Sequence, residues 1–193
     1  MQNGPTRTVE RRRRTNLLLL SLLLAAAVVA VAFALVVAPP PSRTTAETVR
    51  FVISGSQENM AFSPTNFTVH AGALVTVIIT NYDNESHPTP PLAQMVSGTI
   101  GGTASYQFSL ASRGVSLTQL GATDISHTFS MDFGSWWINV PIPPASTSSN
   151  PSVVSFTMSL STVGTYAWYC DAMCGDLPMT PPGLMAGYVH VVN

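Results

Sequence analysis

The residues best suited to chemistry gather near the C-terminus, where the stretch from Cys170 to Met185 reads CDAMCGDLPMTPPGLM. Thiolate and thioether sulfur, combined with imidazole, form the donor set of copper sites that transfer electrons. No histidine lies between Cys170 and Met185, so an imidazole must come from another part of the chain. The stretch therefore predicts a soft metal site completed from elsewhere.

Two neighbouring strands are expected to hold this sulfur-rich stretch. The segment TYAWY (165–169) predicts a strand that ends at Cys170, and Met185 opens the predicted strand GYVHVV (187–192). One strand fixes the cysteine, the other fixes the methionine, and the sheet supplies rigidity. The segment ISHTFSM (125–131) alternates polar and apolar residues and predicts the strand that brings His127 to the site.

These motifs resemble the cupredoxin family. The run Met185-Ala-Gly-Tyr-Val-His-Val is similar to the axial-methionine end of the family's copper loop, and Cys170 matches its thiolate ligand. The spacing of Cys170 and Cys174 resembles the binuclear loop of oxidase subunit II, in which both cysteines bridge two coppers. His127, in DISHTF, resembles the first histidine of that subunit. The resemblance implies a Greek-key β-sandwich that binds one copper ion or two.

The chain departs from the family pattern at the histidine expected within the loop. Met179, Asp176 or a distant histidine would have to take its place, and Met179 is the best local candidate because thioethers suit Cu(I). His87, which follows the strand-like segment VIITN, also resembles the approach to the first histidine, but Pro-Thr-Pro-Pro follows it. We predict His127, Cys170 and Met185 as ligands, followed by Cys174 and Met179, with His87 last.

The rest of the chain reads as an all-β domain over residues 49–193. No window outside the N-terminal segment shows sustained helical periodicity. The segment 81–124 is long for a loop and is predicted to be an insertion that contains at least one strand pair. Further strands are predicted at 48–54, 67–69, 74–80, 105–110 and 153–160.

The N-terminal segment predicts a membrane anchor. Residues 1–16 are basic, residues 17–38 form an apolar run broken only by Ser21, and residues 39–48 form a Pro/Ser/Thr linker. An apolar run of this length can span a bilayer as one transmembrane helix, and the arginines before it keep the N-terminus inside. A cleaved signal peptide is the alternative. Either prediction places the domain outside the cytoplasm, and the first makes it a single-pass protein of the cell membrane.

The charge pattern excludes some functions. The chain has no lysine, and beyond Ser42 only Arg43, Arg50 and Arg113 are basic, so a nucleic-acid partner is not expected. No phosphate-binding loop, paired-carboxylate signature or nucleophile motif is present in the sequence. The chain is therefore predicted to be an electron carrier without its own catalytic residues. The partners implied are redox proteins of a respiratory chain, such as a terminal oxidase or a cytochrome.

Two alternatives compete with the electron carrier. The chain could be a metal-free cupredoxin-like structural subunit of an oxidase, as the missing loop histidine suggests. It could instead be an envelope β-sandwich in which Cys170 and Cys174 form a disulfide. His70 and His190 are interpreted as structural, and Trp136 and Trp137 as packing residues, a cover for the copper loop or a docking patch.

Overall fold

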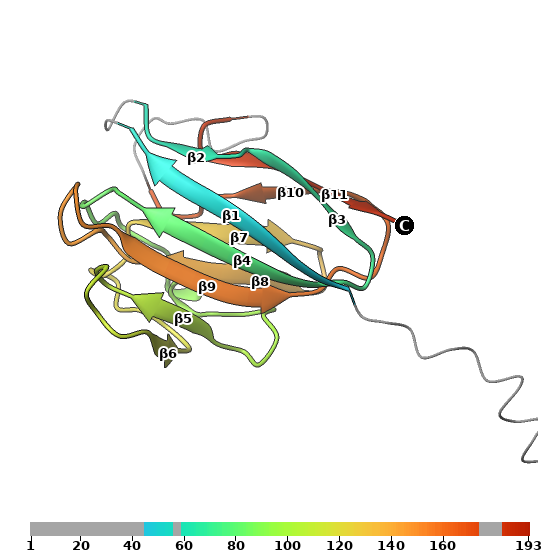
Figure 1. The fold of residues 1–193 in the computed structure, drawn as a ribbon, viewed down its shortest axis with the longest axis horizontal. Coiled ribbons are helices and arrows are strands. Elements are labelled where there is room, and N and C mark those ends of the chain that lie inside the picture. The colour runs from blue at the N-terminus through green and yellow to red at the C-terminus, as the bar shows by residue number, and fades with distance from the viewer. Residues whose placement is uncertain (1–44, 56–58, 174–182) are drawn as a thin grey trace, which may run out of the picture. The chain divides into compact units, whose positions relative to one another are not determined.

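The fold is all-β, as the sequence predicts, and is shown in Figure 1 by a computed structural model that describes residues 45–55, 59–173 and 183–193. In the described residues the elements are β1 (Ala46–Ser54), β2 (Ala61–Ser63), β3 (Asn66–His70), β4 (Leu74–Asn81), the short 3-10 helix η1 (Pro91–Gln94), β5 (Ala104–Gln107), β6 (Val115–Leu117), β7 (His127–Asp132), β8 (Trp137–Ile142), β9 (Ser152–Met158), β10 (Gly164–Tyr169) and β11 (Ala186–Val192).

The strands form two mixed sheets. One has the order β2-β1-β4-β9-β5-β6, and the other has the order β3-β11-β10-β7-β8. The chain crosses from the first sheet to the second between β2 and β3 and returns before β4. For this reason β1 and β4 are parallel, as are β3 and β11, whereas the other pairs are antiparallel. The strand pair predicted between residues 81 and 124 is β5–β6, and it extends the first sheet through β9.

Period-two alternation of apolar residues directs one face of each sheet into a shared core. In β9 the alternating residues Val154, Phe156 and Met158 are buried, and in β4 every second residue is buried. The centre of the core is aromatic: the ring of Trp168 in β10 lies 5.5 Å from the ring of Phe51 in β1. Contacts of this kind join the two sheets and fix the framework on which the site is built.

The strand register brings distant residues to one end of the second sheet. Tyr169 pairs with Ala186, so Cys170 and Met185 face each other one step beyond the pairing of β10 with β11. The backbone N–H of Cys170 donates to the carbonyl of Met185 at 2.9 Å and closes that end. Tyr169 also pairs with Ser130, which places the start of β7 next to the end of β10.

Gly187 is required where β11 passes another chain segment. A Cβ atom at this position would overlap the carbonyl oxygen of Thr65, and the indole nitrogen of Trp168 also lies close. That same carbonyl accepts hydrogen bonds from the backbone N–H of Tyr188 and from Trp168 Nε1. Gly187 therefore allows β11 to pack directly against the backbone of Thr65.

Strands β2 and β8 were not predicted from the sequence, and β6 was expected only as part of a strand pair somewhere within residues 81–124. Strand β8 contains Pro141, which pairs with Thr128, and is followed directly by Pro143 and Pro144. Proline lacks an N–H group and is confined to strand positions that do not need one, which weakens the sequence signal of such a strand. The predicted anchor and most of the linker lie outside the described residues. Within the part that the structure describes, no helix is long and apolar enough to cross a bilayer.

Candidate metal centre

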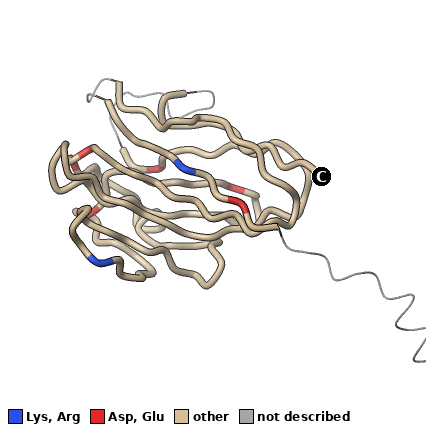
Figure 2. The backbone as a smooth tube through the Cα atoms, in the orientation of Figure 1, with Lys and Arg blue, Asp and Glu red and all other residues tan. Residues whose placement is uncertain are grey.

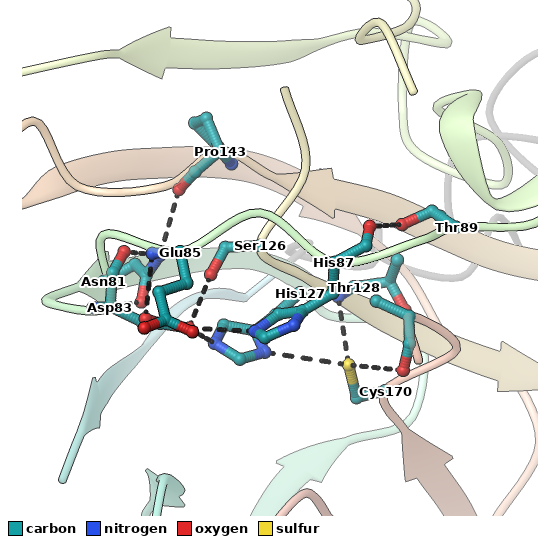
Figure 3. Close-up of polar contacts among 11 residues, drawn as sticks. Asn81, Asp83, Glu85, His87, Thr89, Ser126, His127, Thr128, Pro143 and Cys170 are labelled. Carbon is teal, nitrogen blue, oxygen red and sulfur yellow. Dashed lines mark hydrogen bonds and ion pairs between the residues drawn. The ribbon is translucent and has the colours of Figure 1, made fainter. Parts of the chain in front are cut away.

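Three segments far apart in the sequence meet at one end of the sandwich (Figure 3). The turn after β4 contributes Asp83 and His87, the start of β7 contributes His127, and the end of β10 contributes Cys170. His127 is fully buried, Asp83 and Cys170 are almost fully buried, and His87 is partly exposed. The site therefore lies just below the surface, with one imidazole at its edge.

Both nitrogens of the His127 ring face a polar partner. Nε2 lies 2.9 Å from Oδ2 of Asp83, and Nδ1 lies 3.9 Å from Sγ of Cys170. Burial alone would lower the pKa of His127, but the hydrogen bonds to Asp83 and Cys170 raise it to about 8. An imidazole held in this way carries a proton on the carboxylate side and presents Nδ1 to the sulfur.

The sulfur of Cys170 is placed to act as a thiolate. The backbone N–H of Thr128 donates to Sγ at 3.4 Å, and the hydroxyl of Thr128 accepts the N–H of Asp171 at 2.6 Å. Hydrogen bonds to sulfur and a neighbouring imidazolium favour the charged form of a cysteine. The thiolate is also the form that binds metals.

Asp83 is fixed by the turn in which it lies. Its backbone N–H donates to Oδ1 of Asn81 at 3.0 Å, and the Asn81 amide donates to the carbonyl of Pro143 at 2.9 Å. Burial alone would raise the pKa of Asp83. The hydrogen bond and charge of His127, with hydrogen bonds from the backbone of Glu85 and the hydroxyl of Ser126, hold that pKa well below its usual range. Asp83 is therefore a buried carboxylate that stays ionised.

His87 lies beside His127 and shares its carboxylate. Nε2 of His87 is 3.3 Å from Oδ2 of Asp83, and the two imidazole ring centres are 5.6 Å apart with planes tilted by 42°. The backbone N–H of Met173, just after Cys170, donates to the carbonyl of Pro88. The chain after the cysteine thus pairs with the chain after His87, the histidine that the sequence analysis ranked last.

Of the remaining predicted ligands, Met185 is fully buried, and its carbonyl accepts the backbone N–H of Cys170. Cys174, Met179 and Asp176 lie outside the described residues, and so does one partner of the disulfide alternative. The structure thus brings together His127, Cys170 and His87, and it places the backbone of Met185 next to them.

The geometry fits a metal between the imidazole and the thiolate. Bonds of about 2.0 Å to nitrogen and about 2.3 Å to sulfur, at a trigonal angle, separate the two donor atoms by about 3.7 Å. The observed separation of His127 Nδ1 from Cys170 Sγ is 3.9 Å. A soft thiolate combined with imidazole is a donor set that suits copper. On the other side of the ring, donor atoms of Asp83, His87 and His127 all lie within 4.8 Å of one another.

The other two histidines lie elsewhere and have local partners. Nδ1 of His70 lies 2.8 Å from the carboxylate of Glu47, and Nδ1 of His190 lies 3.1 Å from the hydroxyl of Thr165. Both rings belong to strand surfaces, in agreement with the structural role expected from the sequence.

A groove lies next to the site, on the β7–β8 side. It is lined by both residues that flank the cysteine, and by apolar and acidic residues of η1 and the β7–β8 turn: Pro90, Pro91, Leu92, Asp132, Gly134, Ser135, Trp136, Trp137, Tyr169 and Asp171. Trp136 is 46% exposed and stacks on Phe133 with ring centres 4.0 Å apart. No basic residue lines this groove. Charged residues are few along the described part of the chain (Figure 2).

Asp83 and Ser126 were not identified from the sequence as parts of the site. Asp83 lies between a predicted strand and His87, in the run NYDNESH, where it reads as an ordinary turn residue. The sequence does contain a pattern that could have identified Asp83. An Asn-x-Asp turn (81–83) follows a buried strand directly, and a histidine, His87, lies four residues after the aspartate. Its partner His127 is 44 positions away, and only the fold brings the two together.

Comparison with known proteins gives structural but no sequence relatives. No protein-family model matches the chain, and no curated protein matches it by sequence. Among solved structures it resembles auracyanin A, a "blue" copper protein from Chloroflexus aurantiacus, with 16% identity over 76% of this chain and 99% of that chain and a TM-score of 0.40. A rusticyanin variant matches with 15% identity over 75% of this chain and 78% of that chain, at a TM-score of 0.37.

A multicopper oxidase from Pediococcus acidilactici is also similar, with 11% identity over 81% of this chain and a TM-score of 0.42, but only 29% of the oxidase is covered. These similarities are distant, so the properties of the candidate site are inferred from the side chains of this chain alone. The proteins that the chain resembles in structure are thus two copper proteins and a multicopper oxidase.

Proposed function

We propose that the protein is a copper-binding electron-transfer protein whose metal is held by Nδ1 of His127 and Sγ of Cys170. The observation that carries this proposal is the 3.9 Å separation of these two atoms, with the other ring nitrogen 2.9 Å from a buried carboxylate oxygen. Histidines that bind metals characteristically donate their second N–H to a carboxylate or carbonyl. The ring is thus arranged as a ligand before any metal binds.

Two further residues would complete the copper site. Met185, buried beside Cys170, supplies a thioether as the weak ligand, and His87 supplies the imidazole that the loop lacks. Copper bound there would cycle between Cu(I) and Cu(II). The chain's own contribution is rigidity, since the ends of β10 and β11 are hydrogen-bonded together and His127 is fully buried.

We infer that the domain works on the outer face of a membrane and serves a respiratory chain. The arginine cluster followed by the apolar run 17–38 supports a single-pass anchor with the domain outside. A redox partner such as a cytochrome or a terminal oxidase would approach at the groove lined by Tyr169 and Asp171, the two neighbours of Cys170. The groove combines apolar side chains with Asp132 and Asp171, so it suits a partner surface with lysine or arginine among apolar residues.

Copper titration of the purified full-length protein tests the proposal. After addition of an oxidant, the protein should bind copper and show intense thiolate-to-copper absorption that disappears in Cys170→Ser. Copper should also raise the unfolding temperature, because a ligand bound only by the folded state stabilises it. Absent bands, no bound copper and an unchanged unfolding temperature would instead support the metal-free structural subunit. Mass spectrometry after alkylation without reduction separates both from a disulfide-bonded sandwich.

A further inference from the structure

One carboxylate oxygen serves both imidazoles of the site (Figure 3). Oδ2 of Asp83 lies 2.9 Å from Nε2 of His127 and 3.3 Å from Nε2 of His87, and it accepts the hydroxyl of Ser126 at 2.9 Å. The side chain of Asp83 is only 5% exposed. An ionised group this deeply buried is costly unless each of its lone pairs is used.

An ionised carboxylate can only accept hydrogen bonds, so the Nε2 atom that faces it must carry a proton. When His127 is neutral, its single ring proton therefore lies on Nε2, and the lone pair lies on Nδ1. Nδ1 is the atom that faces Cys170. By holding the proton on Nε2, the Asp83 carboxylate leaves the lone pair of Nδ1 available to bind a metal.

The bonding of Asp83 favours a supporting role over direct ligation. Oδ2 already has three partners, and Oδ1 accepts the backbone N–H of Glu85 at 3.0 Å. Its own backbone is held by Asn81 and by Ala145, whose N–H donates to the Asp83 carbonyl. A side chain held at this many points has little freedom to turn towards a metal.

We propose that Asp83 is a positioning residue of the copper site, which fixes the tautomer of His127 and stabilises Cu(II) with its negative charge. The inference rests on the proposed function in that it assigns copper to His127 and Cys170. The assignment of the tautomer stands on the contacts of Asp83 alone.

The variant Asp83→Asn removes the charge while keeping the shape. Loss of such an outer partner lowers metal affinity by about 10–100-fold. Cu(I) depends less than Cu(II) on a nearby negative charge. If the whole loss falls on Cu(II), the reduction potential rises by about 60–120 mV, since a tenfold change corresponds to about 59 mV for a one-electron couple.

Two matched variants control for other effects. Glu47→Gln removes one negative charge at the far end of β1, where Glu47 pairs with His70, and it should leave the potential unchanged. Ser126→Ala removes one hydroxyl from Oδ2 but keeps the carboxylate, so it should shift the potential less than Asp83→Asn. Thermal unfolding of each metal-free variant shows whether it is folded.

A readout without copper separates the two proposals. In ¹⁵N NMR spectra of the metal-free protein, at a pH high enough for the ring to be neutral, the proton of the wild-type His127 ring should lie on Nε2. Asp83→Asn should mix the tautomers. Wild-type protein that binds no copper but shows this difference would refute the copper assignment and keep the assignment that Asp83 fixes the tautomer of His127.

Two results would overturn the positioning role. One is an Asp83→Asn variant with the wild-type tautomer, copper affinity and potential. The other is a second metal equivalent, tested with Zn²⁺ or copper, that survives Cys170→Ser and is lost in both Asp83→Asn and His87→Ala. That result would make Asp83 a direct ligand with His87 and His127.

Discussion

The sulfur of Cys170 and the Nδ1 atom of His127 lie 3.9 Å apart, although the two residues are 43 positions apart in the sequence. The pairing of β7 with β10 produces this approach, because Tyr169, the last residue of β10, pairs with Ser130, three residues after His127 in β7. Each group has a second contact that fixes it. The other nitrogen of the imidazole lies 2.9 Å from Asp83, and the sulfur accepts a hydrogen bond from the backbone N–H of Thr128. The pair is therefore preorganised, and changes at either residue should have separable effects.

The two cysteines should differ in their importance. Cys170 is the cysteine in contact with His127, so Cys174→Ser is expected to retain one copper per chain and the thiolate-to-copper bands. Cys170→Ser should lose both. Metal-to-protein ratios and visible spectra of the two variants give the answer. Wild-type protein with two coppers per chain, and loss of the spectrum in Cys174→Ser, would point to a binuclear site.

His87→Gln should weaken Cu(II) binding by at least about tenfold, because loss of an outer partner alone has that effect and His87 is proposed as a ligand. The absorption bands should shift while the protein stays folded, since His87 is partly exposed and lies in a turn. His190→Gln is the matched control, as that ring contacts Thr165 on a strand surface. Equal affinities for the two variants would exclude His87 from the site.

The metal-free protein should lose stability as the pH rises from about 6.5 to about 8. The pKa of His127 is raised to about 8 from an ordinary value of 6.5, so the folded state binds a proton more tightly than the unfolded state does. This stabilisation is complete below pH 6.5 and is lost as the pH passes 8. At about 1.4 kcal/mol per unit it amounts to about 2 kcal/mol. Asp83 has the opposite sign, and its contribution is lost as the pH falls through the acid range.

Urea unfolding of the metal-free protein across this pH range measures the effect, and His127→Gln should flatten the curve. Copper should reverse the trend in the wild type, because the metal competes with the proton for Nδ1 and binds more tightly as the pH rises. A metal-free stability that increases between pH 6.5 and 8 would contradict the assignment of the raised pKa to His127.

Gly187→Ala should destabilise the protein by about 1–3 kcal/mol, the usual cost of forcing an extra carbon into a packed region. The added carbon would overlap the Thr65 carbonyl and push β11 away from its neighbours. Gly164→Ala is the matched control at the start of β10, where an added carbon meets the ring of Tyr166 at 3.3 Å. Denaturant unfolding of both variants compares them, and equal stabilities would contradict the close approach seen at Gly187.

Asp132→Asn and Trp136→Ala should slow electron exchange with a basic cytochrome c used as a probe. Both residues line the groove next to Tyr169, and removing a carboxylate lowers the attraction of a cationic partner, by at least about twofold at low ionic strength. The effect of Asp132→Asn should fade in high salt, whereas that of Trp136→Ala should persist. Asp124→Asn, outside the groove, is the control, and an equal effect there would argue against docking at this groove.

The strands with clear alternation could be predicted from sequence. Residues 153–160 show the buried face observed in β9, and β4, β10 and β11 lie within one residue of their predicted bounds. Strand β8 was not predicted because Pro141 within it, and Pro143 and Pro144 directly after it, weaken the sequence signal of a strand. Hydrogen bonding to β7 stabilises this segment as a strand, although its local sequence favours a strand only weakly.

The candidate site was predictable in part. Cys170 and Met185 are close because two neighbouring antiparallel strands must bring the end of one beside the start of the next, which sequence order alone implies. From the sequence, His87 and His127 compete for one ligand position. In the structure, the Nε2 atoms of both rings lie within 3.3 Å of the same oxygen of Asp83. Nothing local distinguishes this aspartate from a turn residue, because its role depends on a histidine that arrives with another strand.

Trp168 lies two residues before the cysteine and is completely buried, with its ring stacked at 5.5 Å on that of Phe129. Its indole N–H is held by the carbonyl of Thr65, so the ring is fixed within the aromatic core. Because the Trp168 indole is rigid and lies close to the candidate metal site, its fluorescence should respond to what is bound there. Occupancy of the pocket by an oxidised, coloured ion should quench its emission, so the fluorescence of the purified protein reports on metal binding.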